Sequence, residues 1–202
     1  MSDHRSSSGT TTRRAMLQSL AGTAGAGFVL PFIPSGHPMH EHLADQSSVA
    51  TADAKATKQN YTPVFLDRHQ LETLEVLAER IVPGSTKARV APFVDSLLSI
   101  GAAASQRRLL GDLGAFEKLA IERHEKSWKR LTPAEQDDLL TYASTTNAGA
   151  PDATIRNDFD DLRGWIAGAY YSSEIGMREL GWTGQVMFDK LPGCEHPAGH
   201  HL

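Results

Sequence analysis

From Tyr61 onward, the spacing of apolar residues along the chain is that of helices. Leu71, Leu74, Leu77 and Ile81 recur at intervals of three and four residues and line one face of a helix. Asp67, with Gln70 three residues later, is typical of a capping box, and Pro83-Gly84 marks the end. The pattern predicts an amphipathic helix between Asp67 and Pro83.

Similar patterns predict further helices. One spans about 91–98, a short segment around 109–113 is interrupted by Gly111 and Gly114, and another helix covers about 116–128. Thr132-Pro133-Ala134-Glu135 is typical of a helix start, with threonine as N-cap and proline at the first helical position. Ile155, Phe159, Leu162 and Ile166 form the last long stripe. No alternating β-branched run suggests a sheet, so we expect an all-α domain, an irregular bundle of about five helices.

The chain changes character from about residue 170, where glycines and aromatic residues predominate. We expect an extended C-terminal tail, and its large apolar groups must pack on its own helices or on another chain. Aromatic residues are enriched in interface cores, which favours a partner. The candidate interface residues are Tyr170, Tyr171, Trp182 and Phe188.

The N-terminal residues 1–34 have the order of a twin-arginine export signal. A polar tract precedes Arg13 and Arg14, and Met16 and Leu17 follow them, with Gln18 where such signals usually have lysine. The apolar run 20–33 is rich in glycine and alanine and is shorter than the roughly 20 apolar residues that a membrane-spanning helix needs. This composition favours an address read by a receptor over a membrane anchor. We therefore expect export to the periplasm through the twin-arginine translocase.

Residues 35–60 are rich in Ser, Ala, Thr and Asp without periodicity, and we interpret them as a flexible linker before the helical domain at 61–202. Two Ala-x-Ala strings, Ala50-Thr51-Ala52 and Ala52-Asp53-Ala54, are possible cleavage sites.

Composition narrows the class of protein further. The 202 residues are 40% hydrophobic and 22% charged, as in a folded soluble domain, and the net charge of −4 argues against nucleic acid as a partner. Cys194 is the one cysteine, which excludes an internal disulfide and a Cys-x-x-Cys-His haem attachment. An unpaired cysteine in an exported chain indicates an inter-chain disulfide, with a buried thiol as the alternative.

Motifs for catalysis and cofactor binding are missing from the sequence. There is no Glu-x-x-His, His-Glu-x-x-His or Gly-x-Ser-x-Gly string, and no dinucleotide fingerprint follows a strand. The histidines at 37–42 and at 196–201 lie in segments without a rigid second layer of ligand-orienting groups, so we assign no metal there. We therefore predict no catalytic, cofactor-binding or metal-binding residue in this chain.

Two ordered segments resemble the small subunit, subunit 3, of gluconate 2-dehydrogenase. They are residues 74–84 with 91–98, and residues 176–184; Gly193-Cys194-Glu195-His196-Pro197 resembles one branch of that family. The resemblance implies a non-catalytic subunit that carries the export signal for a flavoprotein of the glucose–methanol–choline type and stays bound to it. It implies FAD in that large subunit, and often a multi-haem cytochrome c as a third subunit.

Two other readings remain open from the sequence. The chain would be an exported enzyme if scattered residues such as Glu122, His124 and Asp160 came together in a site. It would be a stand-alone periplasmic binding or adaptor module if it were stable without a partner. Turnover by the purified chain distinguishes the first, and a ligand-dependent melting shift the second.

Overall fold

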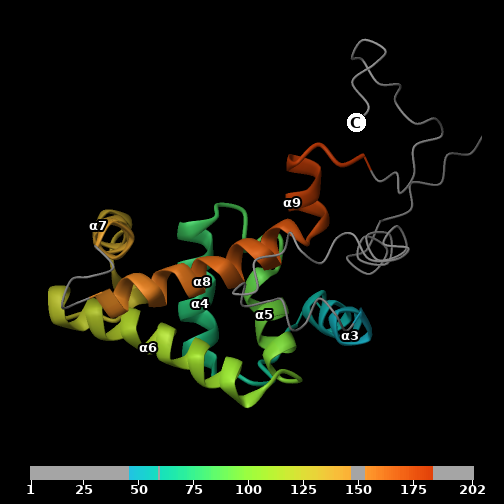
Figure 1. The fold of residues 1–202 in the computed structure, drawn as a ribbon, viewed down its shortest axis with the longest axis horizontal. Coiled ribbons are helices and arrows are strands. Elements are labelled where there is room, and N and C mark those ends of the chain that lie inside the picture. The colour runs from blue at the N-terminus through green and yellow to red at the C-terminus, as the bar shows by residue number, and fades with distance from the viewer. Residues whose placement is uncertain (1–45, 59, 147–152, 184–202) are drawn as a thin grey trace, which may run out of the picture.

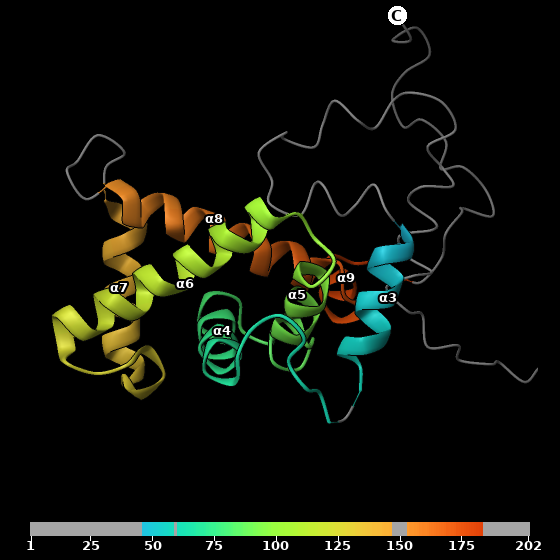
Figure 2. The same cartoon turned by 90° about the horizontal axis from the view of Figure 1, so that it is seen from below.

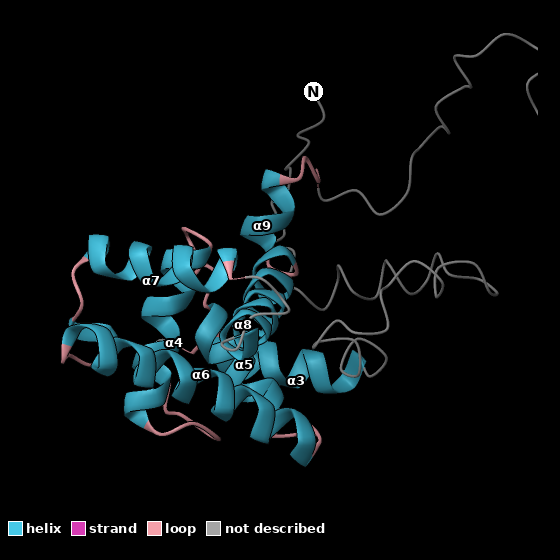
Figure 3. Cartoon of the chain, turned by 60° about the vertical axis from the view of Figure 1, so that its left-hand side comes forward, coloured by secondary structure: helices cyan, strands magenta, loops and turns pink. Residues whose placement is uncertain are grey.

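The computed structural model describes residues 46–58, 60–146 and 153–183, and this part of the chain is helical without strands (Figures 1 and 3). In order, the elements are α3 (Gln46–Ala56), α4 (Arg68–Ile81), α5 (Val90–Leu98), α6 (Ala103–His124), the 3-10 helix η2 (Trp128–Arg130), α7 (Pro133–Thr145), α8 (Ala153–Tyr171) and α9 (Glu174–Glu179). The prediction of an all-α fold is confirmed. Among the described helices, none is long and apolar enough to cross a membrane.

Helix α4 begins and ends as its sequence predicts. The Asp67 carboxylate accepts a hydrogen bond from the Gln70 N–H at 2.8 Å, and the Gln70 side chain accepts one from the Asp67 N–H at 2.9 Å. This reciprocal capping box satisfies two backbone donors that the first turn leaves free. Gly84, with φ of 94°, then turns the chain away after the helix.

Helix α5 is the centre of the fold, and all nine of its residues are buried. It packs against α3, α4 and α8, which surround it (Figure 2). Its sequence is apolar except for Asp95 and Ser96, and Pro92 lies in the first turn, where a missing N–H costs no helical hydrogen bond.

Helices α6 and α8 lie side by side and form the long edge of the domain (Figures 1 and 2). The predicted interruption at Gly111 and Gly114 is wrong, because α6 runs through both positions for 22 residues. A Cβ at either glycine would meet no atom within 4 Å, so each lies on an open helix face. The cost of about 1 kcal/mol per helical glycine is outweighed by the buried stripe at Leu109, Leu113 and Phe116.

The end of α6 is followed by η2 and α7. Glu125, in the left-handed region with φ of 56°, ends α6, so Trp128 belongs to η2 and not to the predicted helix. The Trp128 side chain is fully buried and meets the Phe116 ring edge to face at 5.6 Å. The predicted start of α7 is confirmed, since Thr132 and Glu135 form a second capping box.

The segment predicted as a flexible linker contains a helix. Residues 46–56 form α3, which packs on α5 and buries Val49, Ala52 and Ala56. These small residues at intervals of three and four form too weak an apolar pattern for the sequence to reveal. Of the predicted linker, residues 35–45 and 59 lie outside the described residues.

The predicted start of an extended tail at about residue 170 is also corrected. Residues up to Tyr171 continue α8, and α9 follows after a bend of two residues, so the described chain is helical to residue 179. Residues 184–202, the remainder of the predicted tail, lie outside the described residues.

Candidate partner interface

The bend between α8 and α9 is fixed by local hydrogen bonds. Ser173 caps α9: its hydroxyl accepts from the Gly176 N–H at 3.1 Å and donates to the Tyr170 carbonyl at 2.6 Å. A Cβ on Gly176 would lie 2.4 Å from that same carbonyl oxygen. Glycine therefore allows α9 to sit directly against the end of α8, and α9 projects from the body of the domain at the end away from α7 (Figure 1).

The end of α9 is a Schellman motif. The Gly181 N–H donates to the Arg178 carbonyl at 3.0 Å, the Trp182 N–H donates to the Met177 carbonyl at 3.0 Å, and Gly181 has φ of 83°. Only glycine adopts this conformation without strain. The motif fixes the direction in which Leu180 and Trp182 leave the helix.

This corner exposes large apolar side chains. Leu180 is 65% exposed and Tyr171 is 41% exposed, while Trp182 is half-buried. We call Tyr171, Leu180 and Trp182 the α9 corner. Val64, Ile100 and Ile121 are the other large apolar side chains exposed in the described chain. Exposed apolar side chains at the end of the projecting helix α9 are available for burial against another protein.

The candidate interface residues do not all lie at this surface. Tyr170 is 1% exposed, and its hydroxyl donates to the Glu179 carboxylate at 2.7 Å. Burial, and then this hydrogen bond, raise the pKa of Tyr170 to about 12. Tyr170 therefore belongs to the core of this chain and locks α9 onto α8, whereas its neighbour Tyr171 faces outward, with the two rings edge to face at 5.2 Å.

Several predicted residues lie outside the described part of the chain. These are the signal residues Arg13, Arg14, Met16 and Leu17, the tail residue Phe188, and the candidate disulfide residue Cys194. Their roles stay predictions.

The scattered residues of the alternative enzyme reading do not converge. Glu122 pairs with Lys118 at 3.6 Å, Asp160 pairs with Arg156 at 2.7 Å, and His124 approaches Glu135 at 3.6 Å. Each of the three residues is therefore engaged with a different neighbour.

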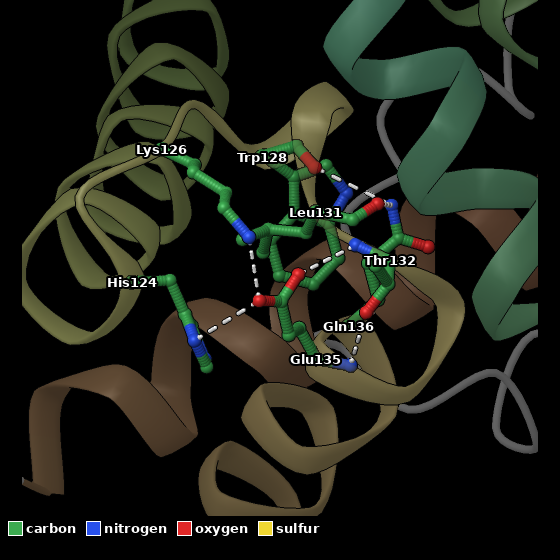
Figure 4. Close-up of polar contacts among 7 residues, drawn as sticks. All are labelled: His124, Lys126, Trp128, Leu131, Thr132, Glu135 and Gln136. Carbon is green, nitrogen blue, oxygen red and sulfur yellow. Dashed lines mark hydrogen bonds and ion pairs between the residues drawn. The ribbon is translucent and has the colours of Figure 1, made fainter.

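Figure 4 shows that the Glu135 carboxylate lies close to His124, to Lys126 and to Thr132, the N-cap residue of α7. The Lys126 ammonium lies 2.7 Å from its carboxylate, and the Thr132 N–H also donates to it at 2.7 Å. These hydrogen bonds lower the pKa of Glu135 to about 2. A carboxylate with so low a pKa is a weak general base, and its hydrogen bonds are those of a helix cap.

Two surface hollows flank α4, with volumes of about 450 and 480 Å³. The first contains Arg68, Glu72 and Glu75, and the second contains Glu75, Glu79 and Arg80. Several of these charges are already engaged: Glu72 with Lys129 at 2.6 Å, Glu79 with the Gly84 and Thr86 N–H groups, and Arg80 with Asp137. Within the described residues, no group of three or more histidine, cysteine, aspartate or glutamate side chains is placed to hold a metal ion.

The sequence pattern did not reveal the roles of two polar residues, one within α5 and one at its start. Asp95 is fully buried on α5, and Arg89, at the N-cap of α5, has the left-handed φ of 58°. Asp95 accepts hydrogen bonds from the Tyr61 hydroxyl and from the backbone of residues 64–66. Asp95 stands out in the sequence as a charged residue inside an apolar run. The sequence does not identify its hydrogen-bond partners, because they lie about thirty positions away.

The described chain is thus a helical domain whose projecting helix α9 is followed by the exposed side chain of Leu180. The model of the family described as gluconate 2-dehydrogenase subunit 3 matches residues 68–193, more than half of the chain, and the chain belongs to this family. The family is that of a small subunit of a dehydrogenase complex. Comparison with curated proteins and with solved structures finds no significant match.

Proposed function

We propose that this chain is the non-catalytic small subunit that escorts an FAD-dependent dehydrogenase subunit, of the glucose–methanol–choline type, through twin-arginine export. It stays bound to that subunit in the periplasm and stabilises it there. FAD belongs to the large subunit, and a multi-haem cytochrome c is a further partner. The α9 corner is the part of the described surface that we assign to contact with the large subunit.

Family membership carries this proposal, and two further features support it. The family name places the chain in a multi-subunit dehydrogenase. The leader has the twin-arginine order, and this pathway moves proteins that are already folded, so a partner can load its cofactor before export. Leu180 and Tyr171 offer exposed apolar area at the α9 corner that is available to an interface.

Affinity purification of the tagged full-length chain from its native host tests the proposal. We expect a flavoprotein in roughly equal amount, identified by mass and by flavin absorbance. A colourless single chain, with no large subunit in any fraction, would contradict it. A specific contact of this kind buries roughly 1,200–2,000 Å² in total, so the complex is expected to survive gel filtration.

The assigned surface is tested with Leu180→Glu. Because Leu180 is 65% exposed, this change leaves the melting temperature of the free chain nearly unchanged. If Leu180 is buried in the complex, recovery of the flavoprotein falls by about tenfold or more, since each tenfold in affinity corresponds to about 1.4 kcal/mol.

Ile121→Glu is the matched control, since Ile121 is 53% exposed on α6. We expect it to leave recovery of the flavoprotein unchanged. Equal losses in the two variants would remove the assignment of the α9 corner.

The export part is tested separately with Arg13→Lys and Arg14→Lys together. Receptor recognition of the arginine pair predicts that both this chain and the flavoprotein then stay in the cytoplasm. Export of the flavoprotein in the double variant would contradict the escort role while leaving the complex itself intact.

Cys194 is proposed to form a disulfide with the large subunit after export. This chain and the large subunit are expected to run together as one band on a non-reducing gel and as two bands after reduction, and Cys194→Ser abolishes the joint band. Two bands under both conditions would contradict this pairing.

A further inference from the structure

The region between the leader and the family-matched part contains α3, which bears three overlapping Ala-x-Ala strings. Ala50-Thr51-Ala52, Ala52-Asp53-Ala54 and Ala54-Lys55-Ala56 lie wholly within the helix Gln46–Ala56. Ala52, which the first two strings share, is 1% exposed, and Ala56, which ends the third, is 0% exposed. Proteases bind and cut extended, accessible chain, so cleavage at any of these strings requires α3 to unwind.

The first attachment of α3 to the domain is an apolar seam. Val49, Ala52 and Ala56 follow each other at intervals of three and four residues, and all are at most 2% exposed. They pack on α5, whose nine residues are all buried. Removal of α3 would expose part of this apolar helix to water, so α3 acts as a structural element of the core.

The second attachment is a cap supplied by Arg89. Its Nε donates to the Ala56 carbonyl at 3.1 Å and its Nη2 donates to the Lys58 carbonyl at 3.0 Å. A cation at a helix C-terminus satisfies free carbonyls and complements the helix dipole.

Arg89 holds this position from an uncommon backbone conformation, with φ of 58° and ψ of 39°. For a residue other than glycine, such a conformation costs energy that surrounding contacts must offset.

We infer that α3 is a permanent part of the folded domain and that folding closes its three Ala-x-Ala strings to processing. If the leader is removed, the cut lies before Gln46. The exported protein then keeps the whole of α3, which shields part of α5 from water. The statement about export rests on the proposed function. Only a chain that crosses the membrane already folded reaches a signal peptidase with α3 formed. The closure of α3 itself does not depend on export.

Elastase digestion of the purified full-length chain tests the closure directly, because this protease accepts small residues in its specificity pocket. The measured quantity is the rate of cutting within residues 46–58, followed by mass. Val49→Asp places a charge in the seam, and we expect it to raise that rate by about tenfold or more. Thr51→Asp, at an exposed position of the same helix, is the control, with no expected rise.

Arg89→Gly provides a variant that preserves the fold. Glycine suits the left-handed conformation, so α5 begins as before, while the cap on α3 is lost. We expect cutting within 46–58 to rise about fivefold. The inference is overturned if the unchanged chain is cut after Ala52 or Ala54 as fast as the Val49→Asp variant.

N-terminal sequencing of the chain recovered from the periplasm completes the test. We expect an N-terminus at or before Gln46, and the double variant Ala50→Glu with Ala54→Lys, which destroys all three strings and adds a helix-stabilising charge pair, to give the same N-terminus. An N-terminus at Asp53, Lys55 or Thr57 overturns the inference while leaving export intact. A chain found in the cytoplasm alone contradicts the export proposal, and the elastase result then decides the closure of α3.

Discussion

Asp95 on α5 and Asp112 on α6 are both buried aspartates, at 0% and 3% exposure, but their surroundings are opposite. The Asp95 carboxylate accepts hydrogen bonds from the Tyr61 hydroxyl and from three backbone N–H groups, at 2.5–3.0 Å. Asp112 Oδ2 has no hydrogen-bond partner. Desolvation, and then the nearby carboxylates of Asp161 and Asp158, raise the pKa of Asp112 to about 8.

The difference shows how the same residue type serves two purposes in one domain. Asp95 ties the segment before α4 to α5, and it does so by satisfying donors that would otherwise be buried without partners. Asp112 Oδ2 has no such donor, and the Asp112 carboxyl group instead shares a hydrogen bond with Asp158, so its burial favours the protonated form and makes folding depend on pH. We therefore expect changes at Asp95 to lower stability through the loss of these hydrogen bonds, and changes at Asp112 to act mainly at neutral and alkaline pH.

The largest effect is expected for Asp95→Ala. The buried Leu66 N–H donates to Asp95 Oδ1 at 2.6 Å and would lose this carboxylate acceptor. The Val64 and Phe65 N–H groups would lose the same acceptor. We expect the free energy of unfolding to fall by about 3 kcal/mol, measured by urea denaturation at pH 7. Ser96→Ala, at the adjacent buried position, is the control with an expected loss below about 1 kcal/mol. Equal losses in both variants would mean that packing, not the carboxylate, is what matters.

Asp112→Asn should give the next largest effect, with the opposite sign. The pKa of Asp112 is about 8 in the folded chain against an ordinary 3.8, so the folded state binds the proton more tightly. The contribution of Asp112 to stability is then most favourable below about pH 4 and becomes less favourable as the pH rises towards 8. Asparagine removes this dependence, and we expect a gain of about 2 kcal/mol at pH 8 that shrinks towards zero at pH 4.

Urea midpoints measured across this pH range check the prediction for Asp112. Asp138→Asn, at an exposed position of α7, is the control and should leave the profile unchanged. A pH profile of the Asp112→Asn variant parallel to that of the unchanged chain would contradict the assignment.

Tyr61→Phe removes one of the four hydrogen-bond donors to the Asp95 carboxylate. The Tyr61 hydroxyl lies 2.5 Å from Asp95 and 2.9 Å from Ser96, and burial, followed by the bond to Asp95, raises the pKa of Tyr61 above its usual range. Since three backbone donors remain, we expect a loss of about 1 kcal/mol, measured in the same urea experiment. A loss as large as that of Asp95→Ala would show that the tyrosine, and not the backbone, dominates the contact.

The features that the sequence predicted are local ones. The two capping boxes, at Asp67 with Gln70 and at Thr132 with Glu135, depend on residues three positions apart, and both are present. The predicted interruption at Gly111 is wrong because burial of one face of α6 outweighs the cost of a glycine on the opposite face of that helix. Helix α3 was missed because alanine and a single valine form its seam.

The candidate interface was predictable only in part. Tyr170 and Tyr171 are adjacent in sequence, but consecutive residues of a helix point about 100° apart, so one is buried and the other exposed. The sequence alone did not reveal that α8 continues through this pair. Asp95 and Asp112 stand out as charges within buried stretches, yet whether donors surround them depends on distant segments, and that distinction needs the structure.

The smallest effect is expected for Arg108→Gln, which isolates the electrostatic part of the difference. The Arg108 guanidinium pairs with Asp161, and its charge partly offsets the rise in the pKa of Asp112 and Asp158. Its side chain is 63% exposed, so solvent screens the interaction, and we expect a loss below about 0.5 kcal/mol at pH 8. Because removal of the cation raises the pKa of Asp112 further, the descending limb of the stability profile extends to higher pH.

The coupling is measured by combining Arg108→Gln with Asp112→Asn. If Arg108 acts through the charge of Asp112, its effect at pH 8 shrinks in the asparagine background, whereas independent effects would add. Arg107→Gln, exposed on the same helix, controls for the loss of one positive charge. An Arg108→Gln effect that is the same size at pH 5 and pH 8 would place its role in the ion pair with Asp161 alone, and the difference between Asp95 and Asp112 would then rest on desolvation and the neighbouring carboxylates.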